Sequence, residues 1–577
     1  MDKQLIFSDY LVFIIYFIIV AGYGYWVYRK KKKAFTDTKD FFLAEGSLTW
    51  WAIGASLIAS NISAEQFIGM SGDGFFAGVA VAAYEWLAAV ALIIIAVWFI
   101  PIYLKNKIYT MPQFLKMRYN DTVALIMAVF WLFLYVLVNL TSILYLGAKA
   151  INGLVGGEYL HVIMIGLALF ALIITLGGMK VIGYTDVIQV AVLIIGGLAT
   201  TYLALNMVSH KVGNGSGAWD GFTTLMKDSP DHFKMIFKKP TAESSQYDVQ
   251  RYVILPGIAM YLAGQWIVNL NYWGCNQYIT QRALGANLQT ARNGILFAGM
   301  LKLMMPVIVM LPGIAAFVLY KNGHLEGLMT SVQDNHLYKV KDDAYSVILS
   351  FLPNGLKGLS IAALTAAIVA SLAGKANSIS TIFTLDIFKK YISKDSDEKS
   401  LVRVGRITIV AAMIFAIFLT WNDLLGIGGE GGFTFIQKYT GFISPGIFAM
   451  FILGMFWKRT TGTAAIAGIL TGFIVSVIFN NYAPEWFGHE TLLYTSFEVI
   501  KEVKGVQVHT WEIPFLICMG WSFVFTMIVM VALSLAGPKV NPKAFVLEKG
   551  MFKVSPTTQV MIVITLLVLS ALYIKFW

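Results

Sequence analysis

The sequence predicts an all-α membrane protein that crosses the bilayer with about 14 helices. Of its 577 residues, 58% are hydrophobic and only 13% are charged, whereas soluble domains carry about 25% charged residues. Its apolar stretches are long enough to cross the ~30 Å hydrocarbon core of a bilayer. Lys and Arg residues gather at the ends of these stretches. Composition, stretch length and charge position therefore indicate the same fold class.

The apolar stretches follow one another along the whole chain. We expect spans at residues 9–28, 48–71, 76–101, 121–147, 159–178, 183–206, 252–276, 294–320, 358–385, 404–421, 432–456, 461–481, 512–536 and 556–576. The first is not a cleavable signal, because its basic cluster, Arg29 to Lys33, follows the apolar run instead of preceding it. This order places the N-terminus outside, and an even number of spans places the C-terminus outside as well.

The basic residues support this orientation. Connections expected to face the cytoplasm carry an excess of Lys and Arg, as the positive-inside rule requires. These residues are Lys105, Lys107, Lys116, Arg118, Lys180, Arg282, Arg292, Lys389, Lys390, Arg403, Arg406, Lys458, Arg459, Lys539, Lys543 and Lys549. The lysine-bearing segment 207–250 is expected outside, but it is long and mixed with acids, a case that the rule exempts. We expect a multi-pass protein of the cell (inner) membrane, in contact with the lipid bilayer.

The charges, the cysteines, the histidines and one motif also argue against several other classes of protein. The net charge of +11 does not indicate nucleic acid, because the basic residues sit where topology needs them. Cys275 and Cys518 both fall in apolar segments, which argues against a disulfide framework. The seven histidines show no metal-ligand spacing. The letters LAGK suggest a phosphate loop, but Val369 and Ala376 replace two of its required residues. We expect no enzyme, no cofactor and no nucleic-acid partner.

Two of the predicted spans are polar in the middle. They contain SLIASNISAEQFIGMSGDG at 56–74 and GQWIVNLNYWGCNQYITQR at 264–282. These are the second and seventh spans, and because they are five spans apart the second runs inverted in the membrane. Paired interrupted helices in two inverted halves are typical of secondary transporters that bind substrate near the midplane. The alternative is that these polar side chains only hold helices together.

Five motifs extend this interpretation. They are DFFLAEGSLTWW (40–51), ASNISAEQFIGMSG (59–72), YEW (84–86), YWGCNQYITQR (272–282) and FIQKYTGFISPG (435–446). Together they resemble the sodium/solute symporter family, and most of all its bacterial sodium/galactose (sodium/glucose) branch. The resemblance runs from about residue 10 to the last span.

The resemblance implies a leucine-transporter-type fold with two inverted repeats of five helices. The implied divisions are an extra helix with a cytoplasmic linker at 1–46, the first repeat at 47–206, an outer loop at 207–250, the second repeat at 251–457 and three further helices at 458–577.

The resemblance also implies a sugar site. A sugar needs many hydrogen-bond donors and acceptors beside an apolar platform. The polar residues that match the family's sugar-binding positions are Gln66, Glu85, Asn269, Lys302 and Gln437. Glu85 and Lys302 can pair, which lowers the cost of each charge in an apolar span. The alternative is a salt bridge between helices that touches no ligand. Ala88 stands where the family has a sugar-binding serine, so one hydrogen bond is missing.

Two gates are implied in the same way. Tyr272 matches the aromatic residue that lies under the sugar and closes the inner gate, and Met70, Tyr84 and Phe433 match the outer gate. Taken alone, each aromatic residue fits core packing as well, so the gate roles rest on the resemblance.

For sodium, the resemblance implies a site of oxygens released where the first broken helix unwinds. The assigned ligands are the carbonyls of Ala59, Ile62 and Ala367 and the hydroxyl of Ser371. A second hydroxyl of the family is lost, because its position is Ala370. We expect a weakened sodium site.

Lys375 is the most unusual residue of the ninth span. A lysine at the centre of a membrane helix costs roughly 2.5–3.5 kcal/mol. It follows Ser371 by about one helical turn, on the cytoplasmic side of the ion site. Asp186, in the motif GYTDVIQ, matches an acid on the family's ion exit path. We expect Lys375 to pair with Asp186 or to substitute in part for sodium; the alternative is that it extends into a cytoplasmic water cavity.

The expected function is secondary active symport, in which sodium entry drives uptake of a galactose- or glucose-type hexose by alternating access. Ala370 and Lys375 leave weak coupling, proton coupling and uniport open. A transporter-like sugar sensor and a channel are rivals, although the longest cytoplasmic connection has only about 20 residues, too few for a signalling domain. We expect a monomer or a weak homodimer.

Overall fold

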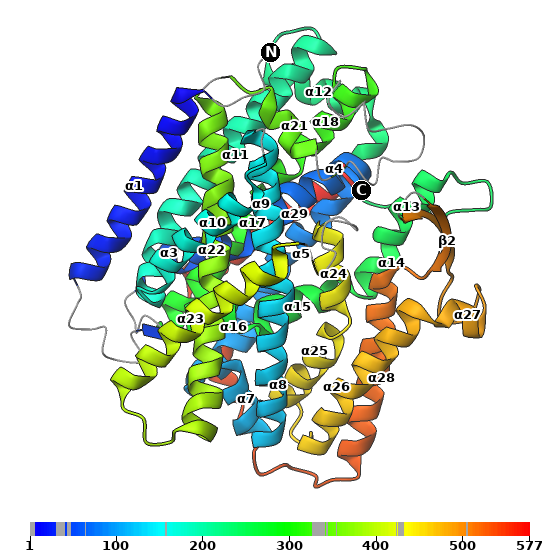
Figure 1. The fold of residues 1–577 in the computed structure, drawn as a ribbon. Helices are drawn as coiled ribbons and strands as arrows, with labels where there is room; N and C mark the ends of the chain where they lie inside the picture. Colours follow the sequence, from blue (N-terminus) through cyan, green and yellow to red (C-terminus); the bar gives the residue numbers. More distant parts are fainter. Residues whose placement is uncertain are drawn as a thin grey trace.

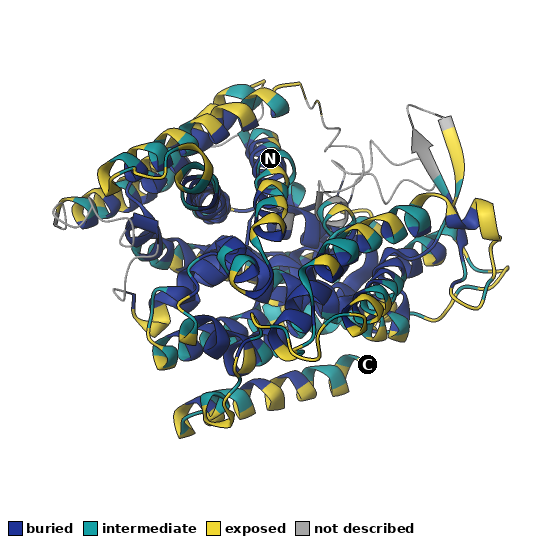
Figure 2. Cartoon of the chain, turned by 90° about the horizontal axis from the view of Figure 1, so that it is seen from below, coloured by how far each residue is buried: buried dark blue, intermediate teal, exposed yellow. Residues whose placement is uncertain are grey.

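The computed structural model describes residues 6–30, 41–42, 48–63, 65–155, 158–325, 341, 344–353, 355–422, 424, 432–503 and 506–577. Within these residues the chain forms a bundle of long helices, with a small β-hairpin at its side (Figure 1). Buried residues fill the centre of the bundle, and the peripheral helices turn exposed residues outward (Figure 2).

The helices cover most of the described chain. Up to residue 233 they are α1 (Phe7–Lys30), α3 (Trp50–Asn61), η1 (Glu65–Met70), α4 (Ser71–Ala77), η2 (Gly78–Ala82), α5 (Ala83–Ile94), η3 (Ile95–Phe99), α6 (Ile100–Lys105), α7 (Met111–Arg118), α8 (Asp121–Phe133), η4 (Leu134–Leu140), α9 (Thr141–Val155), α10 (Leu160–Thr175), α11 (Met179–Lys211), α12 (Ala218–Asp228) and η5 (Pro230–Phe233).

The remaining elements follow in the same way. They are α13 (Gln246–Ile254), α14 (Gly257–Leu262), α15 (Gln265–Cys275), α16 (Gln277–Leu284), α17 (Leu288–Val309), α18 (Leu311–Lys321), α21 (Ala344–Ser350), α22 (Leu356–Thr381), η7 (Ile382–Ile392), α23 (Glu398–Thr420), α24 (Gly432–Gly441), α25 (Ser444–Phe456), α26 (Gly462–Asn481), α27 (Ala483–Phe487), β1 (Phe497–Val503), β2 (Val506–Glu512), α28 (Phe515–Leu535), η9 (Lys549–Phe552) and α29 (Pro556–Phe576).

The prediction of a multi-pass helical membrane protein is confirmed. Among the described residues, ten helical runs are long and apolar enough to cross a membrane, or eleven if one bent pair counts as a single span. Each predicted span overlaps at least one helix among the described residues. The helices α10 and α25 are short, and residues 66–105 form one run across two predicted spans. The count of 14 and the repeat of five plus five helices stay predictions.

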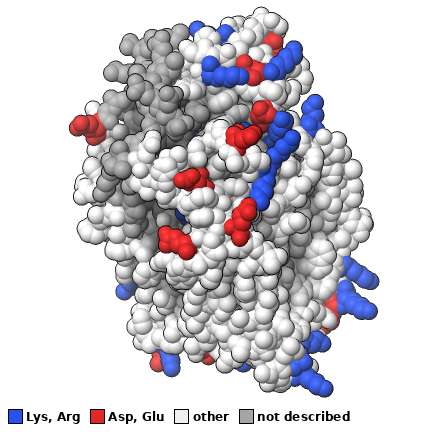
Figure 3. Space-filling model, turned by 90° about the vertical axis from the view of Figure 1, so that its right-hand side faces the viewer, with Lys and Arg blue, Asp and Glu red and all other residues white. Residues whose placement is uncertain are grey.

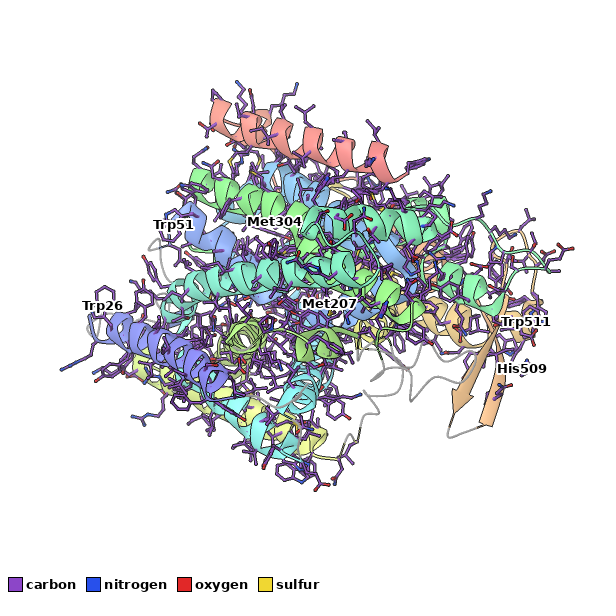
Figure 4. All side chains as sticks on the ribbon, turned by 90° about the horizontal axis from the view of Figure 1, so that it is seen from above. Trp26, Trp51, Met207, Met304, His509 and Trp511 are labelled. Carbon is purple, nitrogen blue, oxygen red and sulfur yellow. The ribbon has the colours of Figure 1, made fainter. Side chains whose placement is uncertain are left out.

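The surface agrees with a membrane environment. Apolar side chains of peripheral helices are exposed, such as Ile18 on α1 (62%) and Leu567 on α29 (65%). Large parts of one face carry no charged side chain (Figure 3). Trp26 on α1 and Trp51 on α3 lie at the edge of the bundle (Figure 4), and tryptophan is enriched where the hydrocarbon meets the headgroups.

The expectation of an all-α chain is wrong in one place. β1 and β2 pair antiparallel, from Phe497 opposite Glu512 to Val503 opposite Val506. Trp511 of β2 stacks on His489, with 3.6 Å between ring centroids, and it lies with His509 at the side of the molecule (Figure 4).

Both polar spans are interrupted. The first breaks after α3, where Ile62 adopts an extended conformation (φ −81°, ψ 113°). In the second, α15 is bent by 78° from the preceding helix pair, and Asn276 is extended between α15 and α16. A side chain at Gly264, within the bend, would place its Cβ 2.5 Å from the carbonyl oxygen of Leu516. The glycine therefore allows α15 to lie against α28.

Some basic residues assigned to topology are buried inside the structure. Arg118 is fully buried and donates to the carbonyl oxygens of Gly454 (2.7 Å), Trp457 (2.9 Å) and Thr460 (3.0 Å). These carbonyls lie at and beyond the C-terminus of α25, where cationic donors are favourable. Arg118 therefore stabilises the end of α25, and its part in the predicted orientation stays a prediction.

Candidate binding site at the broken helices

Glu85 on α5 and Lys302 on α17 form a buried ion pair. Their side chains are only 5% and 1% exposed. The Lys302 ammonium lies 5.4 Å from the ring centroid of Trp273 on α15, a cation–π distance. The structure thus brings together the two charged residues of the predicted sugar site. Because breaking a buried pair leaves an uncompensated charge, each residue holds the other in place.

The other predicted sugar residues lie on neighbouring elements. The Gln66 side chain accepts from the backbone N–H (3.1 Å) and hydroxyl (3.2 Å) of Ser63. Asn269 donates to the carbonyl of Gln265, one turn earlier on α15, at 2.9 Å. Ala88 is buried on α5, and Gln437 is half-buried on α24.

The helices that carry these predicted sugar residues pack against one another in part. α5 packs against both α15 and α17, and α17 also packs against α3. α24 packs against η1, which carries Gln66. The five predicted polar residues therefore lie on η1, which follows the break after α3, on α17 and α24, which pack against η1, and on α5 and α15, which pack against each other and, through α5, against α17.

Tyr272, the predicted inner gate residue, joins the two broken helices. Its hydroxyl accepts from the Nδ2 of Asn61 at 2.9 Å, and its ring lies 5.7 Å from that of Tyr278 on α16. Met70 and Tyr84, predicted for the outer gate, are buried. The side chain of Phe433 lies outside the described residues.

The backbone around the break frees the predicted sodium ligands. In a continuous helix, the carbonyl of Ala59 would accept from Ser63 and that of Ile62 from Gln66. Instead Ser63 N–H donates to the Gln66 side chain, and Gln66 N–H donates to the Ser63 carbonyl at 3.1 Å. Both carbonyls of the predicted site thus lose their helical donors, as a hard cation requires.

The helix that faces this break brings the remaining predicted ligands. Ser371 on α22 donates its hydroxyl to the carbonyl of Ser60 at 2.7 Å, and Ala367 lies one turn earlier on the same helix. Ala370 contributes only a methyl group. The predicted sodium site therefore has one hydroxyl fewer than the family pattern implies.

Asp186 on α11 contacts Arg282, not Lys375 as the sequence led us to expect. The two charges are 3.7 Å apart, and one Asp186 oxygen accepts from Ser56 on α3 at 2.5 Å. Its other oxygen makes no hydrogen bond within the described residues. Arg282, on α16, donates also to Ser56 (2.8 Å), to Ser60 and to the Tyr278 carbonyl. We call Asp186, Arg282, Ser56 and Ser60 the inner cluster.

The inner cluster lies close to the predicted sodium site. Arg282 contacts the side chain of Ser60, the residue whose carbonyl accepts from Ser371. A Cβ at Gly374, three residues after Ser371, would lie 2.5 Å from the Arg282 guanidinium. A larger residue at this position would displace the guanidinium of Arg282 from its present contacts.

Lys375 also lies near this cluster. It is 1% exposed, and its ammonium is 5.0 Å from the ring centroid of Tyr278 on α16. The aromatic face stabilises the buried cation.

Sequence reasoning missed the role of Arg282. We assigned it to topology alone, because a basic residue at the end of an apolar run fits the positive-inside rule. A usable signal was its position at the end of an interrupted polar span, four residues after Tyr278, where a helix places both on one face.

Near the predicted outer gate, three side chains bind the end of α4. His232 contacts the Phe75 carbonyl (3.0 Å), Tyr247 donates to that of Phe76 (2.6 Å) and Arg251 to that of Ala77 (3.4 Å). Burial, and then the nearby Arg251 charge, lower the pKa of His232 to about 4. The imidazole is therefore neutral at pH 7.

A second outer contact involves a buried ion pair. Lys341 lies 2.5 Å from Asp73 on α4, with side chains 1% and 4% exposed. Asp73 follows the predicted gate residue Met70 by three positions. Residues that follow α11 in the sequence thus hold α4 in place next to the predicted outer gate.

Comparison with known proteins places this geometry in a family context. A profile of the sodium:solute symporter family matches residues 41–472. The sodium/glucose cotransporter of Vibrio parahaemolyticus is 42% identical over 583 residues, covering 100% of this chain and 99% of that protein. Two proteins of Mus musculus, sodium/glucose cotransporter 1 and sodium/myo-inositol cotransporter 2, are each 32% identical over 82% of this chain, and cover 71% and 69% of their own lengths.

A solved structure has the same overall architecture. It is a Na+-coupled sialic acid symporter in a substrate-bound outward-open state, with a TM-score of 0.73 over 93% of this chain and 99% of that one. At 20% sequence identity, this likeness concerns the fold alone.

Proposed function

Because the chain belongs to the sodium:solute symporter family, we propose that it couples sodium entry to uptake of a galactose- or glucose-type hexose. The carrying observation is the buried Glu85–Lys302 pair, on helices α5 and α17, where α17 packs against both sides of the break after α3. The relative from Vibrio parahaemolyticus, similar over its whole length, is a sodium/glucose cotransporter. Transport by this family involves no covalent chemistry, and we propose that the chain is not an enzyme.

The sugar is held by groups that match its hydroxyls. Glu85 offers carboxylate acceptors and Lys302 offers ammonium donors, and their pairing keeps both charges inside the bundle. Asn269, Gln66 and Gln437 add amides from three further elements. Tyr272 supplies the flat apolar surface beneath the ring.

Sodium is held by the carbonyls of Ala59, Ile62 and Ala367 and by the hydroxyl of Ser371. When bound, it supplies a positive charge that links α3 to α22. Sodium binding then favours the outward-open arrangement, sugar fills the site, and the two repeats, at 47–206 and 251–457, rock to open the cytoplasmic side. We propose 14 spans, both termini outside, in the cell (inner) membrane, and a monomer or weak homodimer.

The inner cluster supplies the cytoplasmic seal in this proposal. Arg282 and Asp186 connect α3, α11 and α16 through buried contacts, so these contacts must separate before the ion can leave. Met70, Tyr84 and Phe433 form the outer gate, and Tyr272 acts between this gate and the inner cluster.

A second candidate mode is sodium-independent sugar transport. Ala370 removes one sodium ligand, and Lys375 places a fixed ammonium beside Tyr278, about one turn from Ser371. A fixed cation there would hold α22 and α16 together without a bound ion. Hexose uptake by wild type and by K375M, each measured in sodium and in choline, separates the two modes. Wild-type uptake that is equal in both salts, with K375M uptake that requires sodium, would support replacement of sodium by the lysine.

Direct binding measurements test the proposed substrate class. Purified protein is titrated with galactose, glucose, myo-inositol and sialic acid, in sodium chloride and in choline chloride. We expect hexose binding that is tightened by sodium, and sodium binding tightened by the same factor when hexose is present, since linkage is reciprocal. Tighter binding of myo-inositol would move the substrate class to cyclic polyols, and binding of sialic acid alone would contradict the proposal.

A further inference from the structure

Gln265, the first residue of α15, carries a buried amide that the proposed site does not yet use. The residue is 0% exposed, and neither its side-chain nitrogen nor its oxygen makes a hydrogen bond in the described part of the chain. Buried polar atoms in proteins nearly always have a partner. An amide with none on either atom is therefore a candidate ligand-binding group.

The position of Gln265 on its helix points to one ligand. Residues 265, 269 and 272 are spaced four and three apart, so they share one face of α15. Asn269 and Tyr272 are proposed sugar contacts, and Tyr272 reaches Asn61 at the end of α3. The face that carries Gln265 thus turns toward the break in the first broken helix.

The chemistry of the amide fits a sugar. A glutamine offers an oxygen acceptor beside two N–H donors. Two adjacent hydroxyls of a pyranose present a matching acceptor and donor side by side. We propose that Gln265 is a further sugar-binding residue, which takes two adjacent hydroxyls of the hexose one helical turn from Asn269. This inference rests on the proposed function.

The bend before α15 gives the sugar a way to reach the amide. α15 starts directly after the 78° bend, where Ala263 has left helical geometry (φ −90°, ψ −96°). Movement of α14 about this bend would uncover Gln265 without unwinding α15. In the conformation described, the amide is covered and its hydrogen bonds are unmet, which sugar binding would correct.

The test measures dissociation constants for the hexose bound in the titration above and for its monodeoxy analogues, with wild-type protein and Q265L. For wild type, we expect removal of either of two adjacent hydroxyls to weaken binding about tenfold, the effect of one hydrogen bond. For Q265L, we expect weaker binding of the parent hexose and no further loss with those two analogues. Losses at the other hydroxyls should be unchanged.

A matched control separates binding from structural damage. N271L removes another buried amide of α15, which donates to Ser444 on α25 (3.0 Å), and it should keep the wild-type pattern of losses. If Q265L does not fold, Q265M, which keeps the side-chain length, replaces it. A Q265L or Q265M variant that depends on every hydroxyl as wild type does overturns the inference alone. Wild-type protein that binds no hexose overturns the proposed function and this inference with it.

Discussion

The buried pairs Glu85–Lys302 and Asp186–Arg282, both near the broken helices, differ in how well their polar atoms are paired. Glu85 and Lys302 contact each other directly, and Lys302 lies over the Trp273 ring. Asp186 and Arg282 are 3.7 Å apart and both contact Ser56, and one oxygen of the Asp186 carboxylate makes no hydrogen bond among the described residues.

We infer that the two ion pairs have different roles in transport. A closed pair is fixed and presents a constant set of donors and acceptors, as a binding site for a neutral sugar requires. A pair with an unmet oxygen next to the sodium ligands can exchange partners, as a seal that opens during transport requires. The predictions below test that distinction, from the largest expected effect to the smallest.

In the Glu85–Lys302 pair, replacing one residue alone should reduce both hexose binding and stability. We expect E85A to weaken hexose binding more than 100-fold and to lower the thermal stability, because Lys302 is left as a buried charge without its partner, at a cost of about 3–5 kcal/mol. The double variant E85Q/K302M should regain stability without regaining binding. Thermal unfolding and hexose titration check both, and a double variant as unstable as E85A would contradict the assignment.

Changes at Asp186 and Arg282 should affect the sodium dependence of uptake, and their effects should not be independent. We expect D186N and R282M each to change the sodium concentration for half-maximal uptake at least tenfold, with the double variant far from the product of the two effects, since contacting residues are not independent. D386N serves as a control, because Asp386 pairs with Lys390 on η7 at 2.7 Å, outside the proposed site. Independent effects of D186N and R282M would show that the two residues do not act as one seal.

The missing sodium ligand can be restored. We expect A370S to raise the sodium affinity about fivefold, because one further hydroxyl joins Ser371, and S371A to lower it by a similar factor. Sodium titration of hexose binding provides the measurement. No response to either change would place the ion elsewhere.

The stability that His232 contributes at the end of α4 should depend on pH. Because the pKa of His232 is lowered to about 4 by burial and by Arg251, its contribution to stability is complete above pH 6.5 and is lost as the pH falls toward 4. We expect wild type to lose about 2 kcal/mol between pH 7 and pH 5 relative to H232Q, which keeps a donor for the Phe75 carbonyl. Asp231, Arg251 and Lys321 also act on this histidine, so the comparison is made within each pH. Equal pH dependence in the two proteins would contradict the assignment.

The fold was predictable where composition and period decide it. Runs of apolar residues located the long helices, and clustered polar residues in two of the predicted spans located both breaks. Short helices such as α12 and α21 lie outside the predicted spans. The hairpin was missed because residues 497–512 lie between spans, where we looked only for connections. Glu498 separates the apolar Phe497 and Val499, as in a strand with one face on a core, but Ile500 follows and the alternation ends there.

The site was predictable only in part. Glu85 and Lys302 are costly in apolar spans, so each implies a partner, and the structure pairs them. The partner of Asp186 could not be chosen in this way, because Lys375 and Arg282 both carry the needed charge. The choice depends on how α16 and α22 pack around Gly374, which is a tertiary property. Gln265 gave no signal, since a lone glutamine in a polar stretch has no visible lack of partners.

The most direct test of the central claim is uptake of radiolabelled galactose and glucose into proteoliposomes, with an inward sodium gradient or with choline replacing sodium. Sodium-driven accumulation above the external sugar concentration is the predicted result. Equilibration of sugar at the same rate with and without sodium would contradict sodium coupling, and would assign the role of the cation to Lys375.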